Sequence, residues 1–399
     1  MVLRIYNTRT RRKAAFRPSG HVRMYVCGPT VYARSHMGHA RSYVAFDVIR
    51  RYLEFLEHRV RFVVNITDVE DSVTKRAREL RVRPLALAAK YEEEFLADMA
   101  SLGVKRADAN PRVSEHIKDI VAVARDLVAA GKAYVADRSV YLDTGDGRAF
   151  GKLTHTDPMG AIADGGSKGP RKHPLDFAIW KRAKPRGLAW GSPWGPGYPG
   201  WHVECYAMAR KHLGRVDLHG GGRDLIFPHH ESEDAISRAH SGKEYARFWM
   251  HNGYLTLETE KMSKSLGNVV TIREVLAKYP GEVVRLCLAK IHYREDVEYD
   301  KDCFDITAKE LETIRGALGR ARDIATARRS NPAVPQLVDR TRKVFLAAMD
   351  DDFDTNTAFY ALLQFAEALG AIEQMSAADW TDVLATVGDL GTIFGVNFA

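Results

Sequence analysis

The feature that most constrains the fold is a strand–helix–strand succession within the first seventy residues. The segments "VRMYVCG" (22–28) and "RVRFVVNIT" (59–67) are short, β-rich apolar runs, which predicts two buried strands. Between them, "SYVAFDVIRRYLEFLEH" (42–58) carries apolar residues at helical spacing. Strands joined through a helix of this length form a βαβ unit, so we expect a parallel α/β sheet.

The remainder of the chain is long enough, at 399 residues in all, for two or three domains. Residues 72–100 and 113–131 have the pattern of amphipathic helices. The segment from about 144 to 200 combines many Gly and Pro residues with Trp and Phe, which indicates a loop-rich but packed insertion. A second α/β portion is expected from about 201 to 254. From about 304 onward the pattern is helical and predicts a helix bundle.

Composition excludes several classes of protein. Hydrophobic residues make up 45% and charged residues 28%, which is typical of a globular protein. The first residues lack the apolar run of a signal peptide, and no apolar stretch reaches membrane length. The four cysteines are far apart and suggest no disulfide framework; they are Cys27, Cys205, Cys287 and Cys303. We therefore expect a soluble, cytoplasmic protein without a membrane partner.

The charge is distributed unevenly. The chain has a net charge of +8, yet its last 56 residues contain nine acidic residues and no Lys or Arg, so the first 343 carry about +17. A body this basic suits a polyanionic partner such as nucleic acid or nucleotide, although it is also compatible with a solvated basic surface. The arginines of "RGALGRARDIATARR" (315–329) could follow a phosphate backbone or form a solvated helix face. The run "RTRRK" (9–13) is interpreted as a solvated edge.

The stretch "ARSHMGHARSY" (33–43) places His36 and His39 around Gly38 at a predicted helix start. A helix N-terminus offers unpaired N–H groups and a positive dipole end, which attract phosphate. Gly38 lets a ligand approach the backbone, and the histidines could stabilise charge that develops at a phosphate. The pattern alone equally allows two capping or surface histidines.

Two further stretches carry groups with possible chemistry. In "EKMSKSLGNVV" (260–270), Lys261 and Lys264 could clamp a triphosphate or belong to a surface turn. In "FPHHESEDA" (227–235), Pro228 suits a first helical turn. There, His229 and Glu233 have the spacing of two metal ligands on one helix face, and so do His230 and Asp234. Spacing alone does not choose between these pairs, or between a zinc site and surface histidines.

Eight motifs occur in order over residues 22–355 and together resemble the cysteinyl-tRNA synthetases, which are class I aminoacyl-tRNA synthetases. They are "MYVCGPTVY", "HMGHAR", "NITDVED", "HPLDFAIWK", "SPWGPGYPGWHVECYAM", "DLHGGGRDLIFPHHESE", "KMSKSLGN" and "MDDDFDT". The resemblance implies a Rossmann-like α/β catalytic domain at 1–254 with a connective insertion at about 75–200. It further implies a KMSKS-bearing segment at 255–303 and an α-helical bundle at 304–399.

The resemblance also assigns site residues. It implies catalytic and ATP-binding roles for His36, His39, Gly38, Lys261 and Lys264, with Mg²⁺ accompanying the ATP. The implied ligands of one Zn²⁺ per chain are Cys27, Cys205, His229 and Glu233. The implied cysteine pocket comprises Thr30, Thr67, Trp201 and Asp224, with Asp224 as the partner of the substrate ammonium group.

The implied activity is a ligase reaction in two steps: activation of L-cysteine with ATP to cysteinyl-adenylate, then transfer to tRNA(Cys). A shaped pocket alone rejects serine poorly, because serine differs from cysteine only by oxygen in place of sulfur. Zinc would bind the substrate thiolate, whereas a serine hydroxyl stays protonated. The metal therefore accounts for selection without an editing domain.

Three departures from the family pattern bear on the acceptor. Ala33 stands where the family usually has Asp, and Glu70 and Ser72 interrupt a usually acidic run. The chain ends about where the bundle ends, so we expect the anticodon-binding domain to be absent. The cysteine ligase of mycothiol biosynthesis also lacks that domain and transfers cysteine to the amine of an amino sugar. Transfer to a small amine is therefore the alternative, and a non-catalytic paralogue is a third possibility. The motif "CGPTVY" and the basic body favour tRNA.

Overall fold

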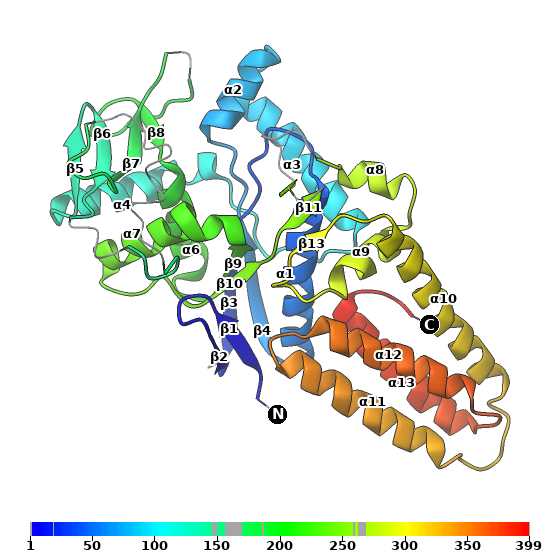
Figure 1. Cartoon of the computed structure of the whole chain (residues 1–399). Helices are drawn as coiled ribbons and strands as arrows, with labels where there is room; N and C mark the ends of the chain where they lie inside the picture. The colour runs from blue at the N-terminus through cyan, green and yellow to red at the C-terminus, as the bar shows by residue number, and fades with distance from the viewer. Residues whose placement is uncertain are drawn as a thin grey trace.

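The computed structural model contains an α/β core, an inserted subdomain and a helical bundle (Figure 1). A short hairpin of β1 (Arg4–Asn7) and β2 (Arg12–Ala15) precedes the core. The structure describes residues 2–18, 20–145, 150–155, 170–185, 187–257, 260–261 (backbone only) and 269–398.

The core is a four-stranded parallel sheet in the order β10–β9–β3–β4. Its strands are β3 (His21–Val26), β4 (Arg59–Val64), β9 (Val216–Gly222) and β10 (Ala246–Asn252). Both faces of β3 are covered, since Met24, Tyr25 and Val26 are all buried, which is usual for a parallel sheet between helices. The predicted βαβ unit and parallel sheet are confirmed.

Helix α1 (Met37–Phe55) makes the crossover from β3 to β4 and begins five residues before the predicted start at residue 42. His36 is the N-cap: its ring accepts a hydrogen bond from the N–H of Gly38, and the ring of His39 accepts one from the N–H of His36. These two bonds form a capping box in which imidazoles replace the usual hydroxyl and carboxylate. The "HMGH" stretch therefore forms the first turn of the helix.

The segment predicted as one helix over 72–100 is two helices, α2 (Asp71–Glu79) and α3 (Pro84–Ser101). Pro84 is the reason, because proline excludes the preceding Arg83 from helical geometry and is itself well suited to a first helical position. The segment predicted as a helix over 113–131 is a 3₁₀ turn, η1 (Val113–Glu115), followed by α4 (Ile117–Ala129).

The insertion contains an antiparallel sheet rather than loops alone. Its strands follow in the order β5 (Ala133–Ala136), β6 (Ser139–Leu142), β7 (Phe177–Arg182) and β8 (Gly197–Pro199). Glycine at 197 permits the pairing of β7 with β8, because a Cβ there would lie 2.3 Å from the indole nitrogen of Trp180. The Gly- and Pro-rich composition therefore conceals two packed strands. Helices α6 (Trp201–Leu213) and α7 (Glu231–Ser241) lead back to the core sheet; between β9 and α7 lie the short turns η2 (Arg223–Leu225) and η3 (Ile226–His230).

The C-terminal part begins with a small sheet in the order β12–β11–β13. Its strands are β11 (Leu255–Leu257), β12 (Glu260–Lys261) and β13 (Val297–Glu298), and α8 (Ile272–Leu276) and α9 (Gly281–Ala289) lie between β12 and β13. The predicted bundle follows, made of α10 (Asp302–Asp323), α11 (Ala333–Asp350), α12 (Thr355–Gly370) and α13 (Ala377–Phe394). Figure 1 shows α9 beside α1, with α10 on the far side of α9, and α13 of the bundle also contacts α1, so the bundle is joined to the core through the helix that carries the histidines.

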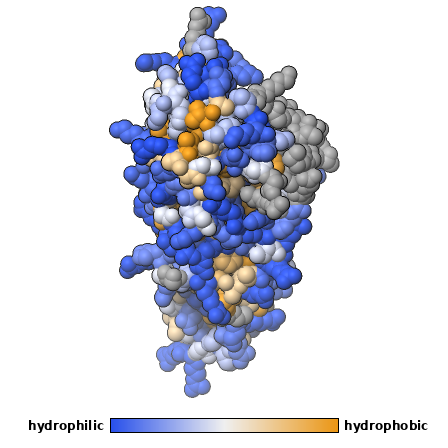
Figure 2. All heavy atoms as spheres, turned by 90° about the vertical axis from the view of Figure 1, so that its left-hand side faces the viewer, coloured by the Kyte–Doolittle hydropathy of each residue, from blue (hydrophilic) through white to orange (hydrophobic). Residues whose placement is uncertain are grey.

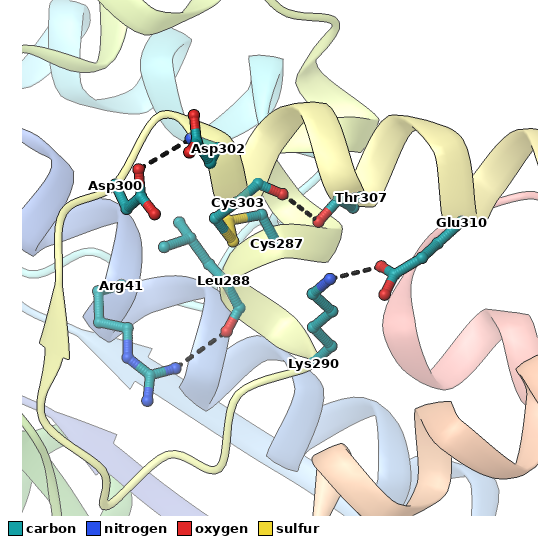
Figure 3. The surroundings of a disulfide bond; sticks show 9 residues. All are labelled: Arg41, Cys287, Leu288, Lys290, Asp300, Asp302, Cys303, Thr307 and Glu310. Atoms are coloured by element: carbon teal, nitrogen blue, oxygen red, sulfur yellow. Dashed lines mark hydrogen bonds and ion pairs between the residues drawn. A yellow bond between two sulfur atoms is a disulfide. The ribbon is translucent and has the colours of Figure 1, made fainter.

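Two expectations from the sequence are wrong. Cys287 of α9 and Cys303 of α10 form a disulfide with a Cα–Cα distance of 6.2 Å, whereas Cys27 and Cys205 are free thiols (Figure 3). Spacing could not reveal this pair, because it depends on how α9 packs against α10. Arg9, expected on a solvated edge, has a side chain only 11% exposed and pairs with Asp234 at 2.6 Å.

The face in Figure 2 is largely hydrophilic, with apolar residues confined to small areas. Among the described residues, no helix has the length and apolarity needed to cross a membrane.

Candidate active site

A cavity of about 320 Å³ opens at the carboxyl ends of the core strands. Parallel α/β sheets bind ligands at this edge. Ten of the residues predicted for the site line it: Cys27, Thr30, His36, Gly38, His39, Thr67, Trp201, Cys205, Asp224 and His229. Segments far apart in the sequence thus converge on a single cavity.

The two histidines of the first turn of α1 lie close together, with ring centroids 3.9 Å apart. Nδ1 of His36 accepts from the N–H of Gly38 at 3.1 Å, and Nδ1 of His39 accepts from the N–H of His36 at 3.2 Å. Because Nδ1 is the acceptor in each ring, the neutral form of each carries its proton on Nε2. The histidines are therefore caps and cavity-lining groups at once, so the two interpretations of the sequence do not exclude each other.

The loops after β3 and β4 are held side by side. The N–H of Thr67 donates to the carbonyl of Pro29 at 3.1 Å, and an isolated β-bridge joins Thr30 to Thr67. Asn65, a residue that sequence reasoning missed, accepts from the N–H of Gly28 at 2.7 Å. A Cβ at Gly28 would lie 1.5 Å from the carbonyl oxygen of Asn65, so only glycine allows this approach. The "NIT" stretch was the available signal.

The four predicted zinc ligands form one group whose candidate ligand atoms all lie within 4.8 Å of one another: Cys27, Cys205, His229 and Glu233. Cys27 follows β3, Cys205 is in α6, and Glu233 is in the first turn of α7. The two sulfur atoms are 3.9 Å apart, and Nε2 of His229 is 3.8 Å from Oε1 of Glu233. All four residues are buried.

This donor set fits zinc. Two sulfurs, one imidazole and one carboxylate are ligands that tetrahedral zinc prefers. Zinc–sulfur bonds of about 2.3 Å at tetrahedral angles place two sulfurs roughly 3.8 Å apart, close to the spacing here. Oε1 of Glu233 is buried and has no hydrogen-bond partner among the described residues, as expected for an atom that faces a cation.

The protonation of the group in the protein alone is set by burial. Burial raises the pKa of the Cys27 thiol, and neighbouring Cys205 raises it further. Burial likewise raises the pKa of Glu233 and lowers the pKa of His229. Each shift favours the neutral form, since a charge in this cluster lacks water. A bound cation would reverse these preferences for the thiols and the carboxyl group.

A second set of four buried groups overlaps the first and consists of Cys27, His219, His230 and Glu233. In this set Nε2 of His219 lies 2.9 Å from Oε2 of Glu233, while His230 turns Nδ1 to Nε2 of His251 at 2.7 Å and Nε2 to Sγ of Cys27 at 3.3 Å. His219 thus orients Glu233, a role that sequence reasoning missed although the residue lies in "DLHGGG". Asp234 pairs with Arg9 and Arg238 and lies outside both sets, so the alternative pair of His230 and Asp234 does not form a site.

The predicted cysteine pocket adjoins this cluster. Trp201, the first residue of α6, stacks on His229 with ring centroids 4.4 Å apart. Asp224 lies in the 3₁₀ turn η2 after β9, beside Gly222, where a Cβ would meet its carboxylate at 2.4 Å. An aromatic ring, a carboxylate and the thiol–imidazole cluster thus surround the same side of the cavity.

Part of the predicted site lies outside the described residues. Lys264 falls there, and for Lys261 the backbone alone is described, in β12. Two of the departures have a structural role: Glu70 is the N-cap of α2, and its carboxylate accepts hydrogen bonds from the N–H and hydroxyl of Ser72. Nothing in the structure explains Ala33.

Residues 15–309 match the family of tRNA synthetases class I (C) catalytic domains. The chain belongs to this family. The cysteine–tRNA ligase of Thermococcus onnurineus is 46% identical over 382 residues, which cover 92% of this chain and 80% of that protein. The cysteine–tRNA ligase of Pelotomaculum thermopropionicum is 46% identical over 387 residues, with coverage of 94% and 80%. The chain is therefore a class I synthetase-type ligase.

Solved structures support the fold. Methionyl-tRNA synthetase of Mycobacterium tuberculosis, bound to methionyl-adenylate, superposes with a TM-score of 0.68 at 18% identity, covering 94% of this chain and 90% of that chain. LeuRS of Agrobacterium radiobacter K84, in a ternary complex with tRNA, superposes with a TM-score of 0.70 at 10% identity, covering 96% and 86%. The Rossmann-like class I architecture implied by the eight motifs is confirmed.

Proposed function

We propose that this protein activates L-cysteine with ATP to cysteinyl-adenylate at a zinc site and then transfers cysteine to tRNA(Cys). The observation that carries the proposal is the single cavity that contains the first-turn histidines of α1 together with Cys27, Cys205 and His229. The high identity to two cysteine–tRNA ligases over most of the chain supports the same activity.

The roles of the residues in ATP binding follow from their positions. His36 and His39 at the N-terminus of α1 bind the phosphates and stabilise negative charge in the transition state, with Gly38 allowing close approach. The resemblance assigns Lys261 and Lys264 to the triphosphate as well, and Mg²⁺ enters with the ATP. Adenylate formation needs little covalent help, so orientation of carboxylate and α-phosphate contributes most of the rate.

The roles in cysteine selection follow from the buried cluster. Cys27, Cys205, His229 and Glu233 hold Zn²⁺, with His219 orienting Glu233. When bound, zinc favours a thiolate over a serine hydroxyl as ligand and so provides the chemistry of selection. Asp224 pairs with the ammonium group of the amino acid, Trp201 covers it, and Thr30 and Thr67 complete the pocket.

The proposal also assigns a role to each part of the chain. Residues 1–254 form the catalytic domain with its connective insertion at about 75–200, and residues 304–399 form the bundle. Residues 255–303 carry the KMSKS motif (261–265), called here the second signature; the first signature is "HMGH" (36–39). The basic surface before residue 343 supports tRNA as acceptor. The similarity to cysteine–tRNA ligases over most of the chain also favours tRNA over a small amine as the acceptor.

Two assays test the proposal. Zinc-loaded protein should exchange radiolabelled pyrophosphate into ATP only when cysteine is present, and serine should not replace it. Radiolabelled cysteine should then appear on tRNA(Cys) and not on an amino sugar. Absence of exchange in folded, zinc-loaded protein contradicts the enzyme assignment. Transfer to the amine with none to tRNA contradicts the acceptor and identifies a small-molecule ligase.

A further inference from the structure

Arg41, two residues after His39, is a charged residue buried within α1 at 1% exposure. Its guanidinium donates only to backbone carbonyls. The acceptors are those of Leu288 at 2.9 Å, Ile291 at 3.2 Å, His292 at 2.6 Å and Glu295 at 3.4 Å. In the part of the chain that the structure describes, no carboxylate forms an ion pair with it. Figure 3 shows Arg41 reaching from α1 to the carbonyl of Leu288, close to the disulfide between α9 and α10.

The acceptors explain why an arginine lies here. Leu288 belongs to the last turn of α9, where carbonyls lack intrahelical partners and the helix dipole favours a cation. Burial lowers the pKa of Arg41 to about 10, so the residue stays charged at neutral pH. The planar guanidinium can hold several carbonyls of residues 288–295 in one geometry, whereas a lysine ammonium cannot span the same set.

Residues 293–299 in turn hold the strand that leads into the second signature. The N–H of Gly253 donates to the carbonyl of Tyr293 at 2.9 Å, and the N–H of Tyr254 donates to the Asp296 carboxylate at 2.7 Å. In the opposite direction, the N–H of Val297 donates to the carbonyl of Tyr254 at 2.9 Å. A Cβ at Gly253 would lie 2.1 Å from the carbonyl oxygen of Glu295, so the two segments are in close contact. Arg41 therefore holds β11 in place through an intermediate segment.

The described residues after the second signature are also bonded to the start of α1. The N–H of Met37 donates to the carbonyl of Val270 at 2.9 Å, and the N–H of Ile272 donates to the carbonyl of Ser35 at 3.2 Å. On the side of the amino-acid pocket, Arg223, next to Asp224, donates to the carbonyl of Arg294 at 2.7 Å. The segment that Arg41 binds is thus connected to both signatures and to the predicted ammonium site.

We propose that Arg41 is a positioning residue that holds β11, the described strand before the KMSKS motif, in place relative to the first turn of α1 through the carbonyls of residues 288–295. This inference rests on the proposed function, because the step that Arg41 would support is adenylate formation. Arg41 does not line the cavity, so it acts through other groups. A displaced β11 shifts the cavity wall at Tyr254 and Leu255 and so impairs orientation of the triphosphate, while the candidate metal cluster and the cysteine pocket stay in place.

The test compares Arg41→Lys and Arg41→Gln with Arg51→Lys as the matched control. Arg51 lies in the same helix and, like Arg41, donates to backbone carbonyls, those of Thr392 and Gly103; unlike Arg41 it also forms an ion pair, to Asp47 at 2.7 Å. Neither carbonyl belongs to residues 288–299. We expect kcat for cysteine-dependent pyrophosphate exchange to fall about 10- to 100-fold in Arg41→Lys, with zinc content unchanged and the KM for cysteine within about twofold of the original. Arg51→Lys should leave kcat unchanged.

Hydrogen exchange provides a readout that does not depend on activity. Amides in 253–257 and 293–299 should exchange faster in Arg41→Lys than in Arg51→Lys or the unaltered protein. An unchanged exchange pattern, an unchanged kcat, or an equal decrease in Arg51→Lys each overturns the proposal. If the unaltered protein shows no cysteine-dependent exchange of pyrophosphate, the proposed function fails, and faster hydrogen exchange alone would still support the positioning of β11 by Arg41. If Arg41→Gln does not fold, Arg41→Lys carries the comparison, since it retains the charge.

Discussion

At the scale of the residue, burial acts on the charge of three of the four groups in the candidate metal cluster. It raises the pKa of Cys27 and of Glu233 and lowers the pKa of His229, and each shift favours the neutral form of that group. Two buried thiols 3.9 Å apart next to a carboxylate would repel one another as anions. A divalent cation removes this conflict and turns the same four groups into strong ligands.

Substitution Cys205→Ser should remove zinc and cysteine activation together, because a hydroxyl is a poor zinc ligand and remains protonated. Metal content by atomic absorption and cysteine-dependent pyrophosphate exchange should both fall at least about tenfold. Cys287→Ser lies outside the cluster and breaks the disulfide to Cys303, so it should lower stability while zinc content and exchange are retained. Retention of one zinc per chain with normal exchange in Cys205→Ser would remove Cys205 from the site.

Substitution Lys264→Ala should depress adenylate formation more than it weakens cysteine binding, since the lysine is assigned to the triphosphate. The expected pattern is a fall in kcat of about 10²-fold, the range seen when one stabilising charge is removed from a transition state, with little change in the KM for cysteine. Lys243→Ala, at an exposed position before β10, is the control. A change confined to cysteine affinity would contradict the phosphate role.

At the scale of the element, caps decide where helices begin, and they were only partly readable from the sequence. The start of α1 at Met37 depends on imidazoles acting as caps, a use of His36 and His39 that the apolar periodicity of 42–58 does not reveal. Pro84, by contrast, predicts the break between α2 and α3 from the sequence. Strands β7 and β8 were hidden because Gly197 serves close packing against Trp180 rather than a turn. The four zinc ligands were predicted from the resemblance of the ordered motifs and not from spacing. Spacing could not decide, because His229 and His230 each have an acidic residue four positions later, Glu233 and Asp234.

Asp379 at the start of α13 provides a test of capping with a defined pH window. Burial alone would raise its pKa, but hydrogen bonds from Ser330, Ser376 and Asn331 outweigh this and lower the pKa to about 2. A depressed pKa means that the carboxylate stabilises the fold above its unfolded pKa of about 3.9 and that this stability is lost as pH falls toward 2. Asp379→Asn should lower the free energy of unfolding at pH 7 by about 1–3 kcal/mol.

The measurement for Asp379→Asn is urea unfolding at pH 7 and at intervals between pH 4 and pH 2. The difference from the unaltered protein should shrink as pH falls through this window. Asp382→Asn, on an exposed face of the same helix, should show no comparable decrease. A difference that stays constant down to pH 2 would mean that shape, and not charge, accounts for the effect.

At the scale of the whole molecule, α1 joins the α/β core to the helical bundle. Asp47 of α1 forms an ion pair at 2.5 Å with Arg285 of α9, and Arg285 donates to the carbonyl of Phe394 at the end of α13. Both charged groups are 1% exposed, so removing one would leave the other buried without its partner. The helix that carries the first signature is thus held by the last helix of the bundle.

The disulfide adds a covalent link within this assembly, because it joins α9 to α10 across a sequence separation of 16. In the chain-entropy account, a loop of this size stabilises a fold by about 3 kcal/mol. Cys303→Ser should therefore lower the thermal midpoint, and reductant should lower that of the unaltered protein but not of the variant. Thiol titration of the denatured, unreduced protein should find two of the four cysteines free. Four free thiols would contradict the link.

The charge asymmetry of the chain predicts where an anionic acceptor binds. Arg328 and Arg329 are exposed in the segment that joins α10 to α11, within the basic part of the chain that ends at Lys343. Reversing both charges, Arg328→Glu with Arg329→Glu, should weaken tRNA binding. The salt dependence of log K should decrease by about one unit for each phosphate that the protein no longer binds. Pyrophosphate exchange should not change, since these residues lie outside the cavity.

The matched control reverses two exposed charges, Arg215→Glu with Lys243→Glu. These residues lie just before β9 and β10, at the end of the core sheet away from the cavity. Both double variants change the net charge equally, so long-range attraction of tRNA should fall to a similar extent in each. A steeper fall in affinity and a smaller salt slope in the arginine variant alone would identify direct binding of phosphates. Equal decreases in the two variants would mean that the basic body acts only through its overall field.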